Sequence, residues 1–323
     1  MKLGRDYTNC LVLDHLNNED RRAFEHGNLD LASVNAIGLE KAKLDVEMQL
    51  KVTQELGMSH VELDSDPPNP YVRLDQSRRE EIRKAAEDAG ISLSLHLPYS
   101  YVGGSICSPG EEERRTAVEF HKRCMKFASD VGAIYVNIHP GSAPFYHRLG
   151  KYNAIIRSSI VNSIVELGEF AKELGLLLHL ENNTAFDGIY SELEDCISLV
   201  EELRSRGVDI YFNFDIGHWF TRADTGSQIP DPPEDSMKKI PKGYMKEVHL
   251  NDYVPGKKMF HPPIHLEWGL LKKENLKRYS EMVKAAGVEV VVLETAMKSN
   301  EQIMDSLDIL KQESEYVRNI FGA

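Results

Sequence analysis

The stretch YFNFDIGH, residues 211–218, shows most clearly the strand pattern that indicates the fold. The stretch begins as a short apolar run of strand length and ends on Asp215, Gly217 and His218. A buried strand that carries a carboxylate and an imidazole to its C-terminal end resembles one edge of a metal site. An aspartate that starts a helix after a strand is also common in purely structural roles. The interpretation therefore depends on whether the chain repeats the pattern.

The chain does repeat it, because short apolar runs alternate with amphipathic helical patterns along most of its length. We expect strands at residues 1–5, 59–64, 91–96, 134–139, 176–181, 210–215, 245–250 and 289–294. We expect helices at about residues 39–56, 76–89, 111–131, 152–174, 191–206, 272–286 and 300–320.

Repeated strand–helix units imply parallel strands joined by right-handed crossovers. Eight such units in 323 residues are the size of a TIM barrel. The predicted fold is thus α/β, a (β/α)8 TIM barrel that forms a single domain over residues 1–323. The alternative is a doubly wound open sheet, which normally carries a Gly-rich phosphate loop. The sequence contains neither GxGxxG nor GxxxxGK.

Three segments do not follow this alternation of strands and helices. Residues 8–38 are irregular and carry turn signals, so their structure is left open. Residues 224–243 and 253–263 are predicted to be long loops at the C-terminal mouth of the barrel, where one or both would act as a lid over a small substrate.

Composition narrows the class of protein. The net charge of −13 argues against broad non-specific binding of polyanions, although a local basic groove would escape this argument. The four cysteines lack CxxC spacing and are predicted to be reduced thiols in a cytoplasmic protein. No apolar run of about 18 residues is present, so no membrane span is expected, and the first residues lack an apolar signal-peptide core.

Nearly every expected strand ends on a potential metal ligand. The seven strand-end residues are Asp64, His96, His139, Glu181, Asp215, His249 and Glu294. In a TIM barrel these ends converge on one mouth, where catalytic groups sit. The alternative, that strand ends are polar because they meet loops, predicts Ser, Asn, Lys and Gly as often as His and Glu. Seven potential ligands in seven strands favour a metal site.

A polar layer is predicted beneath this site. The residues two positions earlier on the same strand face are Glu62, Ser94, Asn137, His179, Asn213, Glu247 and Val292. All but Val292 are polar, whereas a barrel interior filled for stability alone would be Val, Ile and Leu. Polar partners are expected beneath metal ligands because they hold ligand orientation and protonation state. The alternative is a register error of one residue, which would turn several of them toward the helices.

The types of ligand indicate the chemistry. Carboxylates and imidazoles without thiolates suit zinc, manganese, cobalt or magnesium. Such an ion polarises a carbonyl or hydroxyl group, or lowers the pKa of a bound water. A glutamate that the metal does not fully engage can move a proton.

Short motifs in this order resemble the xylose isomerase-like TIM barrels, a superfamily of sugar isomerases and epimerases that also includes the endonuclease IV type of abasic-site nuclease. The matching stretches are HLPY (96–99), HPGS (139–142), LEN (180–182), FDIGH (214–218), VHLND (248–252), HLEWG (265–269) and LET (293–295). They run from the third expected strand to the eighth, about two thirds of the chain.

The resemblance implies a single catalytic metal in the sugar-converting branch. Its two Glu, one Asp and one His match Glu181, Asp215, His249 and Glu294. In such enzymes the two glutamates flank the substrate carbon, so that one removes a proton and the other returns it. Glu181 and Glu294 would take these catalytic roles in a metal-dependent isomerase or epimerase acting on a sugar-like small molecule.

The alternative enzyme is a zinc-dependent abasic-site endonuclease with a larger metal cluster. Its extra ligands correspond to His96, His139, His218 and His265. The aspartate of its Asp-x-His pair falls on Pro263, which cannot coordinate a metal, and nothing in the sequence shows whether His261 replaces it. His218 would be a ligand in a cluster, and a supporting or substrate-contacting residue beside one metal.

Four residues are predicted to contact the substrate: Tyr99, Trp219, Arg222 and Lys257. Tyr99 sits where the nuclease carries a residue that inserts into DNA, but no cluster of Arg and aromatic residues accompanies it. For Trp219 the alternative is packing against the barrel rim, and for Lys257 a solvated loop tip. The expected partner is therefore a small molecule in preference to nucleic acid.

Enzymes of the family are often dimers or tetramers, so the resemblance leaves open whether this chain forms a homo-oligomer. A third alternative is a ligand-binding barrel without catalysis.

Overall fold

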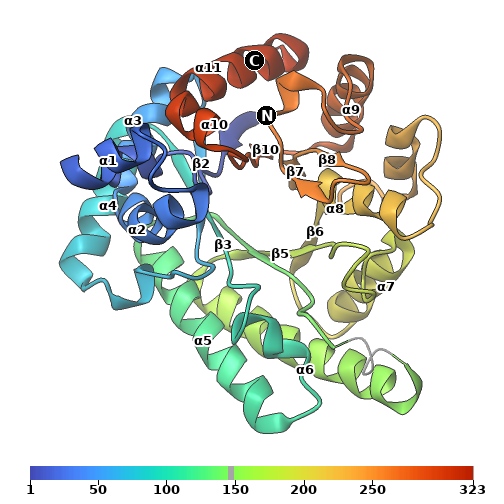
Figure 1. Cartoon of the computed structure of the whole chain (residues 1–323). Coiled ribbons are helices and arrows are strands. Elements are labelled where there is room, and N and C mark those ends of the chain that lie inside the picture. The colour runs from blue at the N-terminus through green and yellow to red at the C-terminus, as the bar shows by residue number, and fades with distance from the viewer. Residues whose placement is uncertain (145–148, 323) are drawn as a thin grey trace.

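The computed structural model describes residues 1–144 and 149–322. Eight parallel strands form a closed barrel in the order β1-β10-β7-β6-β5-β4-β3-β2 (Figure 1). They are β1 (Lys2–Arg5), β2 (His60–Asp64), β3 (Ser92–His96), β4 (Tyr135–Ile138), β5 (Leu177–Glu181), β6 (Ile210–Asp215), β7 (Glu247–Leu250) and β10 (Val290–Leu293). The predicted TIM barrel is confirmed, and an open sheet is excluded because β1 pairs with both β2 and β10.

Helices surround the barrel (Figure 1). They are α1 (Asn18–Glu25), α2 (Leu31–Leu44), α3 (Val46–Glu55), α4 (Gln76–Ala89), α5 (Glu111–Asp130), α6 (Gly150–Leu174), α7 (Leu193–Ser205), α8 (Ile216–Phe220), α9 (Lys273–Ala286), α10 (Asn300–Met304) and α11 (Ser306–Phe321). Among the described residues, no helix has the length and apolar character needed to cross a membrane.

The N-terminal region is more regular than its sequence indicates. Residues 8–38 contain α1 and the start of α2, and the helix expected over 39–56 is two helices that meet at Asp45. The turn signals at residues 17–18 and 26–27 mark the two ends of α1, whose caps are Asn17 and His26. Asn17, Asp30 and Asp45 each accept backbone N–H groups from the first turn of the helix that follows. A cap and a turn use the same residue types, so the sequence alone does not distinguish them here.

The loop expected at residues 253–263 contains an antiparallel hairpin, β8 (Tyr253–Val254) and β9 (Met259–Phe260). The loop over residues 224–243 contains a 3-10 helix, Pro233–Lys239. The expected helix over residues 300–320 is interrupted between α10 and α11 at Asp305.

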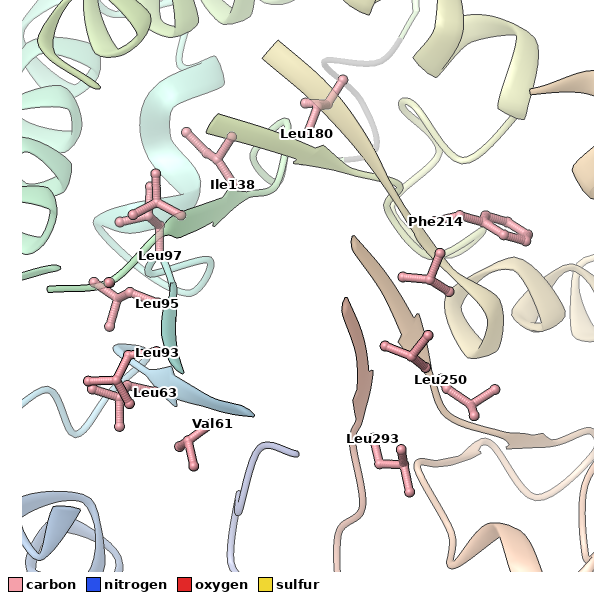
Figure 2. Close-up of a cluster of buried hydrophobic side chains, with 14 of the residues drawn as sticks. Val61, Leu63, Leu93, Leu95, Leu97, Ile138, Leu180, Phe214, Leu250 and Leu293 are labelled. Carbon is pink, nitrogen blue, oxygen red and sulfur yellow. The ribbon is translucent and has the colours of Figure 1, made fainter. Parts of the chain in front are cut away.

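The barrel has an apolar outer face and a largely polar interior, in which Tyr135, Val290 and Val292 form a small apolar cluster. Figure 2 shows side chains such as Leu63, Leu95 and Leu180 pointing away from the centre of the ring of strands, toward the helices. They alternate along the strands with polar residues such as Glu62 and Ser94, which belong to the opposite face. The apolar side chains form the main hydrophobic cluster between strands and helices. This arrangement leaves the interior for the polar residues that support the site.

Candidate metal centre

Four predicted ligands converge at the C-terminal mouth of the barrel. Nδ1 of His249 lies 3.2 Å from Oε2 of Glu181, 3.1 Å from Oε1 of Glu294 and 3.8 Å from Oδ2 of Asp215. They come from β5, β6, β7 and the residue after β10, so strands far apart in sequence supply one cluster. Each side chain is buried. The structure thus brings together the four residues that the sequence identifies as the principal metal set.

The polar atoms of this cluster fit a bound cation. Nδ1 of His249 and Oε1 of Glu181 are buried and have no hydrogen-bond partner. Unpaired buried polar atoms are costly and rare in folded proteins. Three carboxylates and one imidazole that point at a common centre are the donor set of a divalent ion such as zinc, manganese, cobalt or magnesium. The residues therefore fit a metal.

Three further histidines surround Glu181. Nε2 of His96 lies 3.5 Å from Oε2, and Nε2 of His139 and Nδ1 of His218 lie 3.4 Å and 3.2 Å from Oε1. In the described part of the chain, potential ligand atoms within 4.8 Å of one another form four overlapping groups. The groups are His96–His139–Glu181, Glu62–His249–Glu294, Glu181–Asp215–His249 and Asp215–His218–His261. The arrangement has donors for more than one ion.

His261, and not the predicted His265, completes the last of these groups. His261 directly follows the β8–β9 hairpin and adopts a left-handed backbone conformation, with φ of 53°. Its Nε2 is buried without a hydrogen-bond partner. None of the groups of closely spaced ligand atoms in the described part of the chain includes His265. Burial lowers the pKa of His265, and the charged groups that act on it are Glu313 and Arg5, outside the cluster.

Asn251, for which no role is expected from the sequence, links two of the ligands. Its Nδ2 lies 2.6 Å from Oδ2 of Asp215 and 2.6 Å from Oε2 of Glu294. Asn182 holds the backbone of Asp215 from the other side, because its side chain donates to the Asp215 carbonyl and accepts from the Asp215 N–H. Both asparagines lie in the family-like motifs LEN and VHLND, which is the one signal that marks them.

The polar layer predicted below the ligands is confirmed. Its six polar members, Glu62, Ser94, Asn137, His179, Asn213 and Glu247, are all buried. Asn137 donates to Glu247 at 3.1 Å, and Nδ1 of His179 lies 3.0 Å from the same carboxylate. Three contacts reach the ligands. Asn213 donates to Oε2 of Glu181 at 3.3 Å, and Nε2 of His249 lies 2.9 Å from Oε1 of Glu62 and 3.4 Å from Nδ2 of Asn137. These contacts restrict how the ligands can turn.

Burial and charge act in opposite directions on the site. Burial lowers the pKa of His218, but the carboxylates of Asp215 and Glu181 outweigh it and raise that pKa to about 9. Burial raises the pKa of Asp215 to about 8, and the charges of Glu294 and Glu181 add to this effect. For Glu181, the neighbouring His249 and His139 outweigh burial, so its pKa is well below the usual range. Protons and a metal cation would therefore compete for the same atoms.

A cavity of ≈180 Å³ opens onto the centre. It is lined by Asp6, Thr8, Asp64, Asp66, His96, Tyr99, His139, His218, His261 and Glu294. Asp6 and Thr8 are absent from the residues predicted from sequence, because the short first strand ends before a segment whose course could not be predicted. Burial, Glu294 and Asp64 raise the pKa of Asp6 well above its ordinary value.

Only one of the four predicted substrate contacts lines this cavity. Tyr99 does, and its ring centroid lies 4.7 Å from that of His139. Arg222 instead makes contacts of 2.7 Å and 2.6 Å with the carboxylate of Glu192 and covers the ring of buried Trp219. Lys257 is exposed at the tip of the β8–β9 hairpin. The positions of Trp219 and Lys257 agree with the alternatives to substrate contact, which are packing against the barrel rim for Trp219 and a solvated loop tip for Lys257.

Residues 50–320 match the family model described as xylose isomerase-like TIM barrel. The chain belongs to this family. No curated protein matches the sequence.

Solved structures with the same fold share few identical residues with the chain. A putative xylose isomerase from Rhodospirillum rubrum superimposes with a TM-score of 0.74, 16% identity and 99% of each chain covered. A D-tagatose 3-epimerase-like protein has a TM-score of 0.65 at 20% identity, again with 99% of each chain covered. A xylose isomerase-like TIM barrel protein from Mycobacterium smegmatis, in complex with magnesium, has a TM-score of 0.57 and 19% identity over 85% of this chain and 87% of that one.

Proposed function

We propose that the protein is a metal-dependent isomerase or epimerase that acts on a sugar or sugar-like small molecule. The observation that carries the proposal is the convergence of Glu181 and Glu294 on one side of His249 with Asp215 beside them. Two of the similar solved structures are described as a putative xylose isomerase and a D-tagatose 3-epimerase-like protein, which supports the same class of reaction.

Glu181, Asp215, His249 and Glu294 would hold a divalent ion such as zinc, manganese, cobalt or magnesium. The ion would supply Lewis-acid polarisation of a carbonyl or hydroxyl oxygen of the substrate. Glu181 and Glu294 would act on the carbon next to that oxygen, one removing its proton and the other returning a proton. Asn251 contacts the Oε2 atom of Glu294 and holds this carboxylate in place during the transfer.

The histidines and Tyr99 would bind and orient the substrate. His96, His139 and His218 line the cavity together with Tyr99, so their rings would lie against a bound sugar. A sugar that filled the cavity of ≈180 Å³ would displace water from the reacting carbon.

The test uses Glu294→Gln and Glu181→Gln in protein loaded in turn with each candidate metal. Activity is assayed by exchange of a carbon-bound proton of a neutral ketose or aldose with deuterated solvent, followed by NMR. Each substitution keeps the shape of the side chain but removes the base, so exchange should fall at least about 100-fold. Glu55→Gln, on the exposed surface of α3, is the matched control and should keep full activity.

Retained proton exchange in both active-site variants would contradict the proposal. If the wild-type protein binds sugars but never exchanges or converts them, the barrel is a binding protein.

The overlapping histidine groups favour a second candidate, a phosphodiesterase of the abasic-site endonuclease type. His96 and His139 beside Glu181, and His218 and His261 beside Asp215, provide donors for additional ions. Metal analysis of purified protein separates the candidates. About one metal per chain, with no nicking of abasic duplex DNA at low salt, would support the isomerase or epimerase. Several metals per chain together with nicking would support the phosphodiesterase instead.

A further inference from the structure

The cavity over the metal centre contains no lysine or arginine among its lining residues. Its ionisable groups are the four histidines and Tyr99, together with the carboxylates of Glu294, Asp6, Asp64 and Asp66. Proteins bind phosphate and carboxylate groups mainly through arginine, lysine and helix N-termini. A phosphate or carboxylate group of a substrate would face acidic side chains here.

Two of the three aspartates already have ion-pair or hydrogen-bond partners within the protein. Asp64 pairs with Lys43 at 2.8 Å and accepts the N–H of Asp66 at 2.8 Å. Asp66 accepts the N–H groups of Tyr99 and Ser100, each at 2.8 Å, and the hydroxyl of Ser100 at 2.7 Å. Both carboxylates therefore have structural roles.

Asp6 differs because no cation in the described part of the chain pairs with it. The hydroxyl of Thr8 lies 3.0 Å and 2.9 Å from its two oxygens and is its one side-chain hydrogen-bond partner there. Asp6 is nevertheless 93% buried, with 7% of its surface exposed. A buried carboxylate with a single hydroxyl partner retains several unused acceptor positions.

The backbone holds Asp6 toward the cavity. The N–H of Asp6 donates to the Leu293 carbonyl at 3.0 Å, which extends the pairing of β1 with β10 by one residue. Gly4 faces the interior, where an added Cβ would meet His60 at 2.7 Å, and Asp6 lies on the same strand face. Thr8 keeps a φ of 36°, an unfavourable conformation for a β-branched residue that is tolerated mainly at functional positions.

Asp6 and Thr8 also lie before residue 50, where the match to the family model begins. This wall of the cavity is therefore supplied by a part of the chain that the family model does not describe.

We propose that Asp6, supported by Thr8, determines substrate specificity by accepting hydrogen bonds from hydroxyl groups of an uncharged carbohydrate and by rejecting sugars that carry a phosphate or carboxylate against this wall of the cavity. The inference rests on the proposed function, since it assigns the substrate class of the same cavity. It adds a residue that contacts substrate but exchanges no proton with it, so binding should respond more strongly than chemistry.

The test measures binding to metal-loaded protein by calorimetry, with D-fructose and D-xylose compared with D-fructose 6-phosphate and D-xylose 5-phosphate. The wild-type protein should bind at least one neutral sugar about ten-fold more tightly than its phosphate. Asp6→Asn should weaken binding of that neutral sugar about ten-fold and reduce the preference, because the amide replaces one acceptor oxygen with a donor nitrogen. Asp14→Asn makes the same substitution on the exposed surface and should change neither value.

A wild-type preference for the phosphates, no binding of any of the four sugars, or an unchanged preference in Asp6→Asn would overturn the inference. Thr8→Val, which removes the hydroxyl but keeps the side-chain shape, provides a second variant if Asp6→Asn does not fold, and it should also reduce the preference. Binding without proton exchange would refute the proposed reaction but leave the assignment of Asp6 intact.

Discussion

A Cβ atom built on Gly217 would lie 1.6 Å from Oδ1 of Asn251. The backbone of α8, directly after β6, therefore approaches this asparagine as closely as only glycine allows. The contact matters because the amide nitrogen of Asn251 connects Asp215 to Glu294. Gly217 thus indirectly controls the spacing of two candidate metal ligands.

Gly217→Ala should displace Asn251 and weaken metal binding about ten-fold, with a loss of about 1–3 kcal/mol in the free energy of unfolding from overpacking. Metal titration and denaturant unfolding measure the two effects. Asn251→Ala removes the atoms that would clash, so adding Gly217→Ala to it should cost much less. Fully additive costs in this double-mutant cycle would show that the glycine acts elsewhere.

The barrel and the seven strand-end candidates could be predicted because both follow from periodicity, and the family resemblance singled out the four principal ligands among them. Strands that alternate apolar and polar residues put Glu181, Asp215 and His249 on the interior face, and parallel strands end at one mouth. No long-range information is needed for this step. Asn251 could not be given a role in the same way, since its partners belong to two other strands.

The remaining parts of the site depend on loop geometry, which one sequence does not specify. His261 reaches the cluster because a hairpin and a left-handed backbone place it there, whereas spacing in the motif points to His265. Asp6 follows a strand of four residues and precedes a segment whose helix caps resemble turns. Arg222 looked like a pocket residue from its place after β6, but Glu192, thirty residues earlier, binds it.

Arg5 and Glu313 form an ion pair of 2.6 Å in which both side chains are fully buried. Glu313 also accepts the N–H of Ile264 and the hydroxyl of Thr295, so it ties α11 to two loops of the mouth. Glu313→Ala leaves the guanidinium buried without its partner and should cost about 3–5 kcal/mol of unfolding free energy. Chemical denaturation provides the measurement.

The paired change Arg5→Met with Glu313→Leu is the control for this prediction. It removes both charges and keeps apolar volume, so it should be less destabilising than Glu313→Ala alone. A larger loss in the double variant would mean that the hydrogen bonds to Ile264 and Thr295 dominate, and not the unpaired charge.

His121 predicts a pH dependence away from the metal centre. Burial lowers its pKa from 6.5 to about 4, with smaller opposing effects that include the charge of Asp66. Because the folded-state pKa lies below the unfolded one, its stabilisation is complete above pH 6.5 and is lost as pH falls toward 4. The loss attributable to this residue should be about 3 kcal/mol.

Unfolding free energies of the wild type and His121→Gln between pH 7 and pH 4 test this expectation, where the variant should lose less stability on acidification. His26→Gln, at an exposed position, should follow the wild-type curve. Parallel curves for wild type and His121→Gln would contradict the assignment.

His249 and His265 form a matched pair for testing which histidines hold metal. If the cluster around Nδ1 of His249 binds a divalent ion, that ion stabilises the folded state by about 4 kcal/mol at a free concentration a thousand times its Kd. Removing the metal with a chelator should then lower the melting temperature of the wild type, and readdition should restore it. His249→Ala should abolish this response, because it deletes the donor at the centre of the group. His265→Ala should keep it, since His265 belongs to none of the ligand groups among the described residues. Loss of the response in His265→Ala alone would instead assign the metal to the position that the family spacing indicates.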